Sequence, residues 1–288
     1  MNSKVSVIMP AYNAERHIGQ AIGSILGQKD VDFELIVVDD GSTDGTRAIA
    51  RDWYERDSRV IVVCAVGNHG PSAARNRGLR SACGKYIAYQ DADDYSLPGR
   101  LCNQVALLDE RGDVGVVDTN FWLMDRFGRQ RLARQIPSGP AGNRHPKTVT
   151  RLELLCGDPV CCGSVMHRRE LLEKTGWWQG DEVDWGMWVR MQEHAQVVNM
   201  PSASYVYRYD LSGSISHVRG YAKNQHIAVT IMRRCRDRTG EADASRTLWK
   251  HRFMLWAGWC LPGLVRFRVV QWGINAAASL LVGRTPWR

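Results

Sequence analysis

The stretch FELIVVDDGSTDGTRAIARDWY, residues 33–54, contains the pattern that decides the fold of this protein. It opens with a short run rich in Leu, Ile and Val, which is typical of a buried strand. An amphipathic helical pattern follows over residues 44–56, and Ser42, Thr43 or Asp44 is suited to cap the start of that helix. A strand followed directly by a helix is the repeating unit of parallel α/β sheets.

The same alternation continues along the chain. Further strand-like runs are VSVIMP (5–10), RVIVVCA (59–65), KYIAYQD (85–91) and VGVVDTNFWLMD (114–125). Helical patterns cover residues 14–27, 71–82, 98–111, 148–156, 168–175 and 184–194. This order predicts an α/β protein with a mostly parallel central sheet flanked by helices, because parallel strands need helical crossovers.

Composition and charge divide the chain into two regions. With 288 residues, 44% of them hydrophobic and 24% charged, the chain is globular, and its length suits one large domain with an appendage. From His217 onward there are 13 Lys and Arg but only 3 Asp and Glu, so the net charge of +8 belongs to this tail. We therefore predict a domain over residues 1–216 and a basic, helical, Trp-rich extension over 217–288.

The cysteines and the N-terminus favour a cytoplasmic protein. The eight cysteines show no paired CxxC spacing and are too sparse for a secreted disulfide scaffold, so reduced thiols are expected. The N-terminus, MNSKVSVIMP, lacks the features of a signal peptide and begins a strand almost at once.

Acidic residues stand at the predicted carboxyl ends of two strands, at 39–40 and at 91–94, and the first strand ends at residues 10–12. Ligands of open α/β sheets bind at this edge. Carboxylates that converge there suit a hard divalent cation such as Mg²⁺ or Mn²⁺ together with a phosphate-bearing ligand. The alternative is a pair of solvated turns with helix-capping aspartates.

Four segments occur in an order that resembles a known family. They are VSVIMPAYNAERHIGQAIGSILGQ, ELIVVDDGSTDGT, GNHGPSAARNRGLRSACGKYIAYQDADD and WWQGDEVDWGMWVR. Over residues 3–195 the chain resembles the family 2 glycosyltransferases of the GT-A (nucleotide-diphospho-sugar transferase) fold. The resemblance implies metal-dependent, inverting transfer of a sugar from a nucleotide-sugar, by default a UDP-sugar, to a saccharide or lipid-linked saccharide acceptor in cell-surface polysaccharide synthesis.

The resemblance also implies roles for the residues that bind the donor nucleotide. Pro10, Ala11 and Tyr12, in PAYN, correspond to the segment beside the nucleotide base, where Tyr12 would stack. Asp40 corresponds to the acid that hydrogen-bonds the base. Arg75, in ARN, would face the diphosphate, where a basic side chain makes charge-assisted hydrogen bonds.

The DADD sequence matches the DxD motif of the family. Asp93 is the expected ligand of Mg²⁺ or Mn²⁺, and Asp91 would contact the ribose or the metal's outer shell. The cation would neutralise charge on the departing nucleoside diphosphate.

The segment VDWGMWVR aligns Asp184 with the general base of the family. Val183 replaces the acid that usually precedes this base, which leaves Asp181 or Glu182 as alternative contributors and a helix cap as an alternative role for Asp184. Trp185, next to the base, is the expected aromatic contact on the acceptor side.

The tail has the composition of a membrane-surface anchor. Tryptophans lie among Lys and Arg, and the apolar run FMLWAGWCLPGLV (253–265) is shorter than the ~20 residues that span a bilayer. Attachment to the inner face of a membrane is therefore expected, with packing on the catalytic core or a dimer contact as the alternatives. His217, which precedes the tail, is a candidate contact for metal or phosphate. No nucleic-acid-binding motif is present, so no nucleic-acid partner is expected.

Two other functions remain open from the sequence. A sugar-nucleotide pyrophosphorylase also uses an α/β sheet and acidic metal ligands, although PAYNAERH does not resemble its Gly-rich phosphate loop. The missing acid at Val183 would also suit a non-catalytic nucleotide-sugar-binding protein of the membrane surface.

Overall fold

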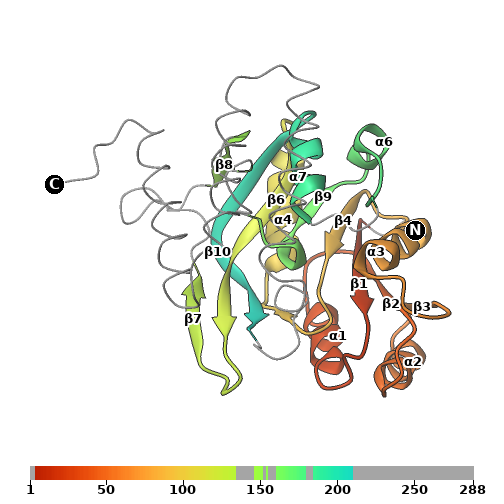
Figure 1. Cartoon of the computed structure of the whole chain (residues 1–288). Helices are drawn as coiled ribbons and strands as arrows, with labels where there is room; N and C mark the ends of the chain where they lie inside the picture. Colours follow the sequence, from red (N-terminus) through yellow and green to blue (C-terminus); the bar gives the residue numbers. More distant parts are fainter. Residues whose placement is uncertain (1–3, 134–145, 152–153, 155–159, 180–183, 210–288) are drawn as a thin grey trace, which may run out of the picture. The chain divides into compact units, whose positions relative to one another are not determined.

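The computed structural model describes residues 4–133, 146–151, 154, 160–179 and 184–209, which belong to one compact unit (Figure 1). His217, the predicted boundary after residue 216 and the whole basic tail lie outside the described residues. Trp185 belongs to a described helix, but its side chain lies outside the description.

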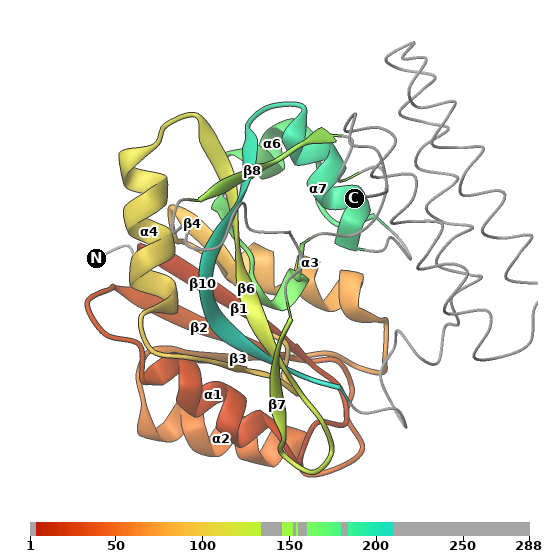
Figure 2. The ribbon, with the colours of Figure 1, turned by 90° about the vertical axis from the view of Figure 1, so that its left-hand side faces the viewer.

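The N-terminal half follows the predicted alternation of strands and helices. Its elements are β1 (Val5–Ala11), α1 (Ile18–Leu26), β2 (Phe33–Asp39), α2 (Thr46–Arg56), β3 (Val60–Cys64), α3 (Pro71–Ser81) and β4 (Tyr86–Tyr89). The strands lie in the order β3-β2-β1-β4, and every pair is parallel. Figure 2 shows α1 and α2 on one side of these strands and α3 on the other, as helical crossovers in a parallel sheet require.

The second half completes a mixed sheet. Its elements are β5 (Tyr95–Ser96), α4 (Arg100–Glu110), β6 (Val114–Met124), β7 (Gln130–Ala133), β8 (Lys147–Val149), the 3₁₀ turn η1 (Cys162–Ser164), β9 (Met166–Arg168), α6 (Leu171–Thr175), α7 (Asp184–Gln192) and β10 (Gln196–Arg208). The order continues β4-β9-β6-β10-β5, with β7 paired to β6 and β8 to β10. Strand β9 is antiparallel to both β4 and β6, so β6 and its parallel neighbour β10 run in the direction of β4. The carboxyl ends of β1, β2, β4, β6 and β10 therefore face one edge of the sheet.

The core forms where helices pack on the parallel strands. Helix α1 places Ile18, Ala21, Ile22 and Ile25 in the interior, at the spacing of one helical face. Gly78 allows α3 to approach the sheet, because a Cβ atom there would lie 2.7 Å from Cγ2 of Ile8. Gly78 therefore has a structural role in the packing of α3 on β1.

Several helices begin later than predicted. Of the helix predicted over 148–156, Arg151 and Leu154 are helical, whereas residues 147–149 form β8, which pairs antiparallel with β10 and buries Val149. Pairing with a long neighbouring strand outweighs the local helical pattern. Helix α4 begins at Arg100 rather than Pro98, because Gly99 precedes it with a left-handed φ of 82°. Within residues 4–209, as far as they are described, no helix has the length and hydrophobicity needed to cross a bilayer.

Candidate active site

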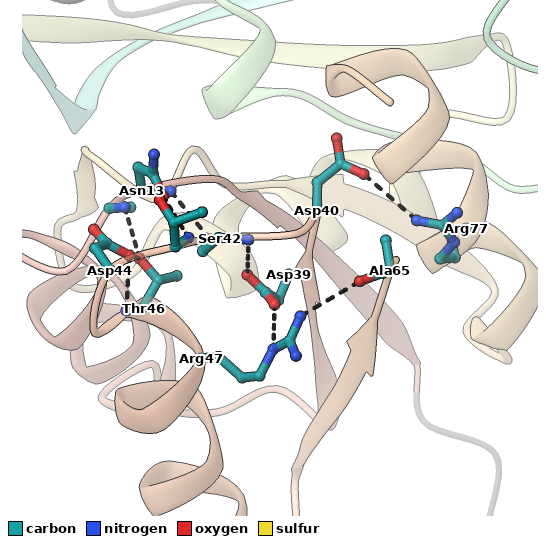
Figure 3. A network of polar contacts seen from close by, with 11 residues as sticks. Asn13, Asp39, Asp40, Ser42, Asp44, Thr46, Arg47, Ala65 and Arg77 are labelled. Atoms are coloured by element: carbon teal, nitrogen blue, oxygen red, sulfur yellow. Dashed lines mark hydrogen bonds and ion pairs between the residues drawn. The ribbon is translucent and has the colours of Figure 1, made fainter. Parts of the chain in front are cut away.

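The loops that follow β1 and β2 are joined by hydrogen bonds. The backbone N–H of Asn13 donates to Ser42 Oγ at 3.1 Å, and the N–H of Thr43 donates to Asn13 Oδ1 at 2.9 Å (Figure 3). These bonds fix the segment that contains the predicted base-binding residues. Within it Ala11 is buried, whereas the Tyr12 side chain is 46% exposed and is available to stack on a planar ligand.

Asp39 and Asp40 adjoin in sequence but have different surroundings. Asp39 is fully buried and accepts hydrogen bonds from Arg47 Nε at 2.6 Å and from the Ser42 N–H at 3.1 Å (Figure 3). Because one oxygen binds the loop after β2 and the other binds Arg47 of α2, Asp39 has a structural role.

Asp40 directly follows β2, and its carboxylate contacts the turn that precedes α3. Its Oδ2 accepts the backbone N–H groups of His69 and Gly70 at 2.9 and 2.8 Å, and its Oδ1 lies 3.5 Å from Nη1 of Arg77. The side chain is only 3% exposed. Its carboxylate is therefore rigidly placed at the edge of the sheet, and its predicted contact with a nucleotide base stays a prediction.

The three acids of the DADD loop divide into one buried and two accessible groups. Asp94 is buried and accepts hydrogen bonds from the hydroxyl of Tyr205 at 2.9 Å and the backbone N–H of Arg208 at 2.7 Å. Asp94 therefore ties the loop to β10. Asp93 is exposed and the side chain of Asp91 is 27% exposed, so these are the two carboxylates that a ligand can reach.

The surroundings of Asp91 favour its protonation. Burial raises the pKa of this carboxyl to about 6, against the opposing effect of Arg75, and the negative charge of Asp93 adds to the increase. A cation at this position would relieve the repulsion between the carboxylates. Hard oxygen donors of this kind suit Mg²⁺ or Mn²⁺.

The accessible carboxylates of the DADD loop suit a metal ion that takes most of its ligands from water and from a phosphate-bearing ligand. No group of three or more His, Cys, Asp or Glu side chains suited to holding a metal ion occurs among the described residues. Asp93 and Asp91 could offer one or two carboxylate oxygens, which is the number that Mg²⁺ commonly takes from a protein when water and phosphates supply the rest.

Arg75 occupies the centre of the candidate site. Its side chain is 6% exposed, and Nη1 donates to Asp184 Oδ1 at 2.9 Å while Nη2 lies 3.5 Å from Asp91 Oδ1. Burial alone would lower the pKa of the guanidinium, but the charges of Asp184 and Asp91 raise it overall, so Arg75 is cationic. One cation thus bridges the two predicted functional acids.

Asp184 reaches Arg75 from the first residue of α7, and its side chain is 34% exposed. Oδ1 accepts the Arg75 hydrogen bond, and Oδ2 accepts none from the described part of the chain. The Arg75 contact gives Asp184 a place within the site, whereas Asp181, Glu182 and Val183 lie outside the described residues.

A chain of buried polar groups supports Arg75. The guanidinium lies 4.6 Å from the centroid of the Trp178 ring. The side chain of Asn76 donates to the Trp178 carbonyl at 2.8 Å and accepts its backbone N–H at 3.1 Å. The indole N–H of Trp178 donates to the Tyr89 hydroxyl at 3.0 Å, and that hydroxyl lies 3.2 Å from Nε2 of His167.

The protonation state of His167 determines the direction of the hydrogen bond between Tyr89 and His167. Burial lowers its pKa to about 4, so the ring is neutral near pH 7. Because Nδ1 lies 2.9 Å from the Arg168 carbonyl oxygen, Nδ1 carries the proton and Nε2 accepts from Tyr89.

Sequence reasoning missed Arg208, at the end of β10. Its Nη1 donates to the Asp93 carbonyl at 3.0 Å, its Nη2 donates to Oε1 of Gln20, and its guanidinium lies 5.3 Å from the centroid of the Tyr95 ring. Arg208 is thus a cation beside the accessible acids. The stretch YRYD (207–210) was the available signal, but within it the sequence does not distinguish this arginine from a surface residue.

Comparison with known proteins identifies the family. The model of "Glycosyl transferase family 2" matches residues 6–176. The putative glycosyltransferase EpsE of Bacillus subtilis is 35% identical over 247 residues, which cover 82% of this chain and 84% of EpsE. The putative teichuronic acid biosynthesis glycosyltransferase TuaG, also of B. subtilis, is 42% identical over 166 residues, covering 58% of this chain and 62% of TuaG.

Solved structures share the fold. Residues 1–349 of S. aureus TarS, in complex with UDP-GlcNAc, align with a TM-score of 0.61 and 22% identity over 80% of this chain and 66% of that one. The mannosyltransferase PcManGT of Pyrobaculum calidifontis, in complex with GDP-Man and Mn²⁺, aligns with a TM-score of 0.60 and 22% identity over 97% of this chain and 81% of its own. Together with the family match over more than half of the chain, these likenesses confirm the expected architecture. The chain belongs to glycosyl transferase family 2 and is a glycosyltransferase of the GT-A fold.

Proposed function

We propose that the protein is a metal-dependent, inverting glycosyltransferase that moves a sugar from a UDP-sugar to a saccharide or lipid-linked saccharide acceptor in cell-surface polysaccharide synthesis. The observation that carries the proposal is the bridge made by Arg75. A single buried guanidinium contacts Asp91, on the donor side, and Asp184, the proposed base. The proposed donor-side acid and the proposed base therefore both lie within hydrogen-bonding or ion-pair distance of Arg75.

The donor assignment rests on the edge formed by β1, β2 and β4. Tyr12 is exposed for stacking on a base, and the carboxylate of Asp40, which the N–H groups of His69 and Gly70 hold in place, would accept the imide N–H of uracil. TarS is described in complex with UDP and UDP-GlcNAc, whereas PcManGT is described with GDP-Man, so the fold accommodates both nucleotides. UDP is our proposal because a carboxylate at Asp40 suits uracil.

The reaction is a single in-line displacement at the anomeric carbon. Asp184 takes the proton from the acceptor hydroxyl as its oxygen bonds to that carbon, and the bond from the carbon to the diphosphate oxygen breaks. Arg75 holds Oδ1 of Asp184 and so orients the carboxylate. Asp93 would hold Mg²⁺ or Mn²⁺, which when bound neutralises charge on the leaving diphosphate, and Asp91 would contact the ribose or the metal's outer shell.

The proposed acceptor is supported by the name of a relative, and the proposed location by the composition of the tail. The name of TuaG refers to teichuronic acid biosynthesis, which supports a cell-surface polysaccharide as the product. We propose a cytoplasmic protein whose basic tail, residues 217–288, attaches it to the inner membrane face. Trp185 would contact the acceptor, and His217 would contact the metal or the phosphates.

Calorimetry tests the donor site. UDP, GDP and their sugar conjugates would be titrated with and without Mn²⁺ into the wild type, Asp93→Ala and the control Asp113→Ala, whose acid lies on a distant loop. We expect Mn²⁺-dependent binding of UDP that disappears only in Asp93→Ala. If UDP binding is independent of metal and equal in all three proteins, the DADD segment is a solvated turn and not a metal site.

A second variant separates the proposed enzyme from its alternatives. Asp184→Asn should retain UDP binding but lose transfer by roughly 10²–10⁴-fold, the usual contribution of a general base. Full activity in Asp184→Asn would remove this residue from catalysis. Exchange that depends on pyrophosphate would favour a pyrophosphorylase, and nucleotide binding without any turnover would favour a non-catalytic protein.

A further inference from the structure

The hairpin between β6 and β7 has an exposed aromatic residue at its tip. Phe127 is 68% exposed, and no strand or helix of the described residues covers it. The guanidinium groups of Arg126 and Arg129 lie 4.7 and 5.1 Å from the centroid of its ring. The tip of the hairpin therefore combines an exposed aromatic ring with two cations in contact with it.

The tip has a defined conformation. Oδ1 of Asp125 accepts the backbone N–H groups of Phe127 and Arg129 at 2.9 and 3.0 Å, and the carboxylate also binds Nε of Arg129 at 2.7 Å. Gly128 takes the left-handed φ of 78° that this turn needs. Phe127 therefore lies on a turn whose conformation is fixed by hydrogen bonds.

The surface around the tip combines apolar and basic side chains. Leu132 on β7 is 42% exposed and lies opposite the half-buried Trp122 on β6. Residues 125–133 contain three arginines, one of them the exposed Arg131, against a single acid, Asp125. We call residues 125–132 the hairpin tip.

The hairpin tip adjoins the edge of the sheet that carries the site. Strands β6 and β10 run side by side, and Figure 1 shows β7 beside β6. Nε2 of Gln130 donates to the Tyr95 hydroxyl at 2.9 Å, and the Tyr95 ring contacts Arg208, which binds the carbonyl of Asp93. Three successive contacts thus connect the hairpin with the DADD loop.

We propose that the hairpin tip docks on an anionic phospholipid surface, with Phe127 in the interfacial region and the arginines on the headgroups. Exposed aromatic and cationic side chains in one place are the composition of such anchors. The basic tail carries 13 Lys and Arg against 3 Asp and Glu, so charge complementarity disfavours it as the occupant. Docking here would bring the DADD loop, and with it the proposed donor site, close to the membrane. Only that consequence rests on the proposed function; the lipid contact does not.

Vesicle flotation of the full chain tests the proposal. Vesicles of phosphatidylcholine would be compared with vesicles that also contain phosphatidylglycerol, using Phe127→Ser and Arg126→Gln. Matched controls are Tyr54→Ser, an aromatic 57% exposed on α2, and Arg51→Gln, an exposed cation on the same helix. We expect the wild type to bind the anionic vesicles only. Phe127→Ser should lower the partition coefficient about tenfold and Arg126→Gln about fivefold, while the controls change it less than about twofold.

Three results would overturn the proposal. Unchanged partition of both hairpin variants would leave vesicle binding to another part of the chain, such as the tail. Absence of binding by the wild type would exclude a lipid surface. Displacement by a soluble acidic polysaccharide, with equal loss in the controls, would indicate a general electrostatic effect. UDP binding is measured in parallel, and its retention in Phe127→Ser separates a failure of this proposal from a failure of the proposed reaction.

Discussion

The guanidinium of Arg75 donates from Nη1 to Oδ1 of Asp184 at 2.9 Å, although 109 positions separate the two residues in the sequence. The same side chain extends Nη2 toward Asp91. Arg75 is buried against Trp178, so its side chain has little freedom to move. It therefore holds both acids in fixed positions. The planar, forked guanidinium is suited to this task, because it offers donors in two directions at once.

Replacing the fork with a single charge tests this relationship. We expect Arg75→Lys to lower kcat by about 10–100-fold, since an ammonium group cannot serve Asp184 and Asp91 together. Steady-state transfer from UDP-sugar is the measurement. Arg80→Lys, an exposed arginine of the same helix, should keep wild-type kcat. Equal activity of the two variants would show that charge alone suffices at position 75.

The support under Arg75 depends on Asn76. Asn76→Ala removes two hydrogen bonds to the backbone of Trp178 and leaves a buried N–H and C=O without these partners. We expect the free energy of unfolding to fall by about 2 kcal/mol and kcat to fall with it, as Arg75 loses its platform. Urea denaturation measures the first effect. Asn103→Ala, exposed on α4, is the control and should change stability by less than about 0.5 kcal/mol.

The turn η1 approaches the DADD loop where Gly163 lacks a side chain. A Cβ atom at this position would overlap the hydroxyl of Tyr205 and lie 2.7 Å from Oδ2 of Asp91. Gly163→Ala should therefore destabilise the protein by about 1–3 kcal/mol and displace Asp91. Gly112→Ala, where a Cβ atom meets nothing within 4 Å, provides the matched control. A Gly163→Ala protein with wild-type stability and UDP affinity would contradict the described packing.

The buried His167 makes stability depend on pH. Its pKa falls from 6.5 to about 4 on folding, so the unfolded chain binds more protons between these values. Stability from this residue is complete above pH 6.5 and is lost as the pH falls toward 4. Between pH 7.5 and 4.5 the wild type should lose about 2–3 kcal/mol more than His167→Gln, in which this group cannot titrate. Urea denaturation at both values gives the difference, and parallel losses in the two proteins would show that His167 does not titrate as described.

The sequence by itself determined the parallel half of the sheet and the identity of the candidate site residues. Alternation between apolar runs and 3.6-residue periodicity is a property of neighbouring residues, so β1 to β4 and α1 to α3 follow from it. The strand ends also follow, because polar residues interrupt the buried runs at Asp39 and Asp91. The GT-A fold was predictable from motifs in these same segments.

Only the tertiary structure decided how those residues are joined. The pairing of Arg75 with Asp184, the use of Asp94 as a tie to β10, and the position of Arg208 at the DADD loop all link distant segments. Strand β9 enters antiparallel between β4 and β6, and β8 replaces part of an expected helix. These contacts depend on which surfaces remain to be buried once the sheet has formed, and local periodicity contains no information about them.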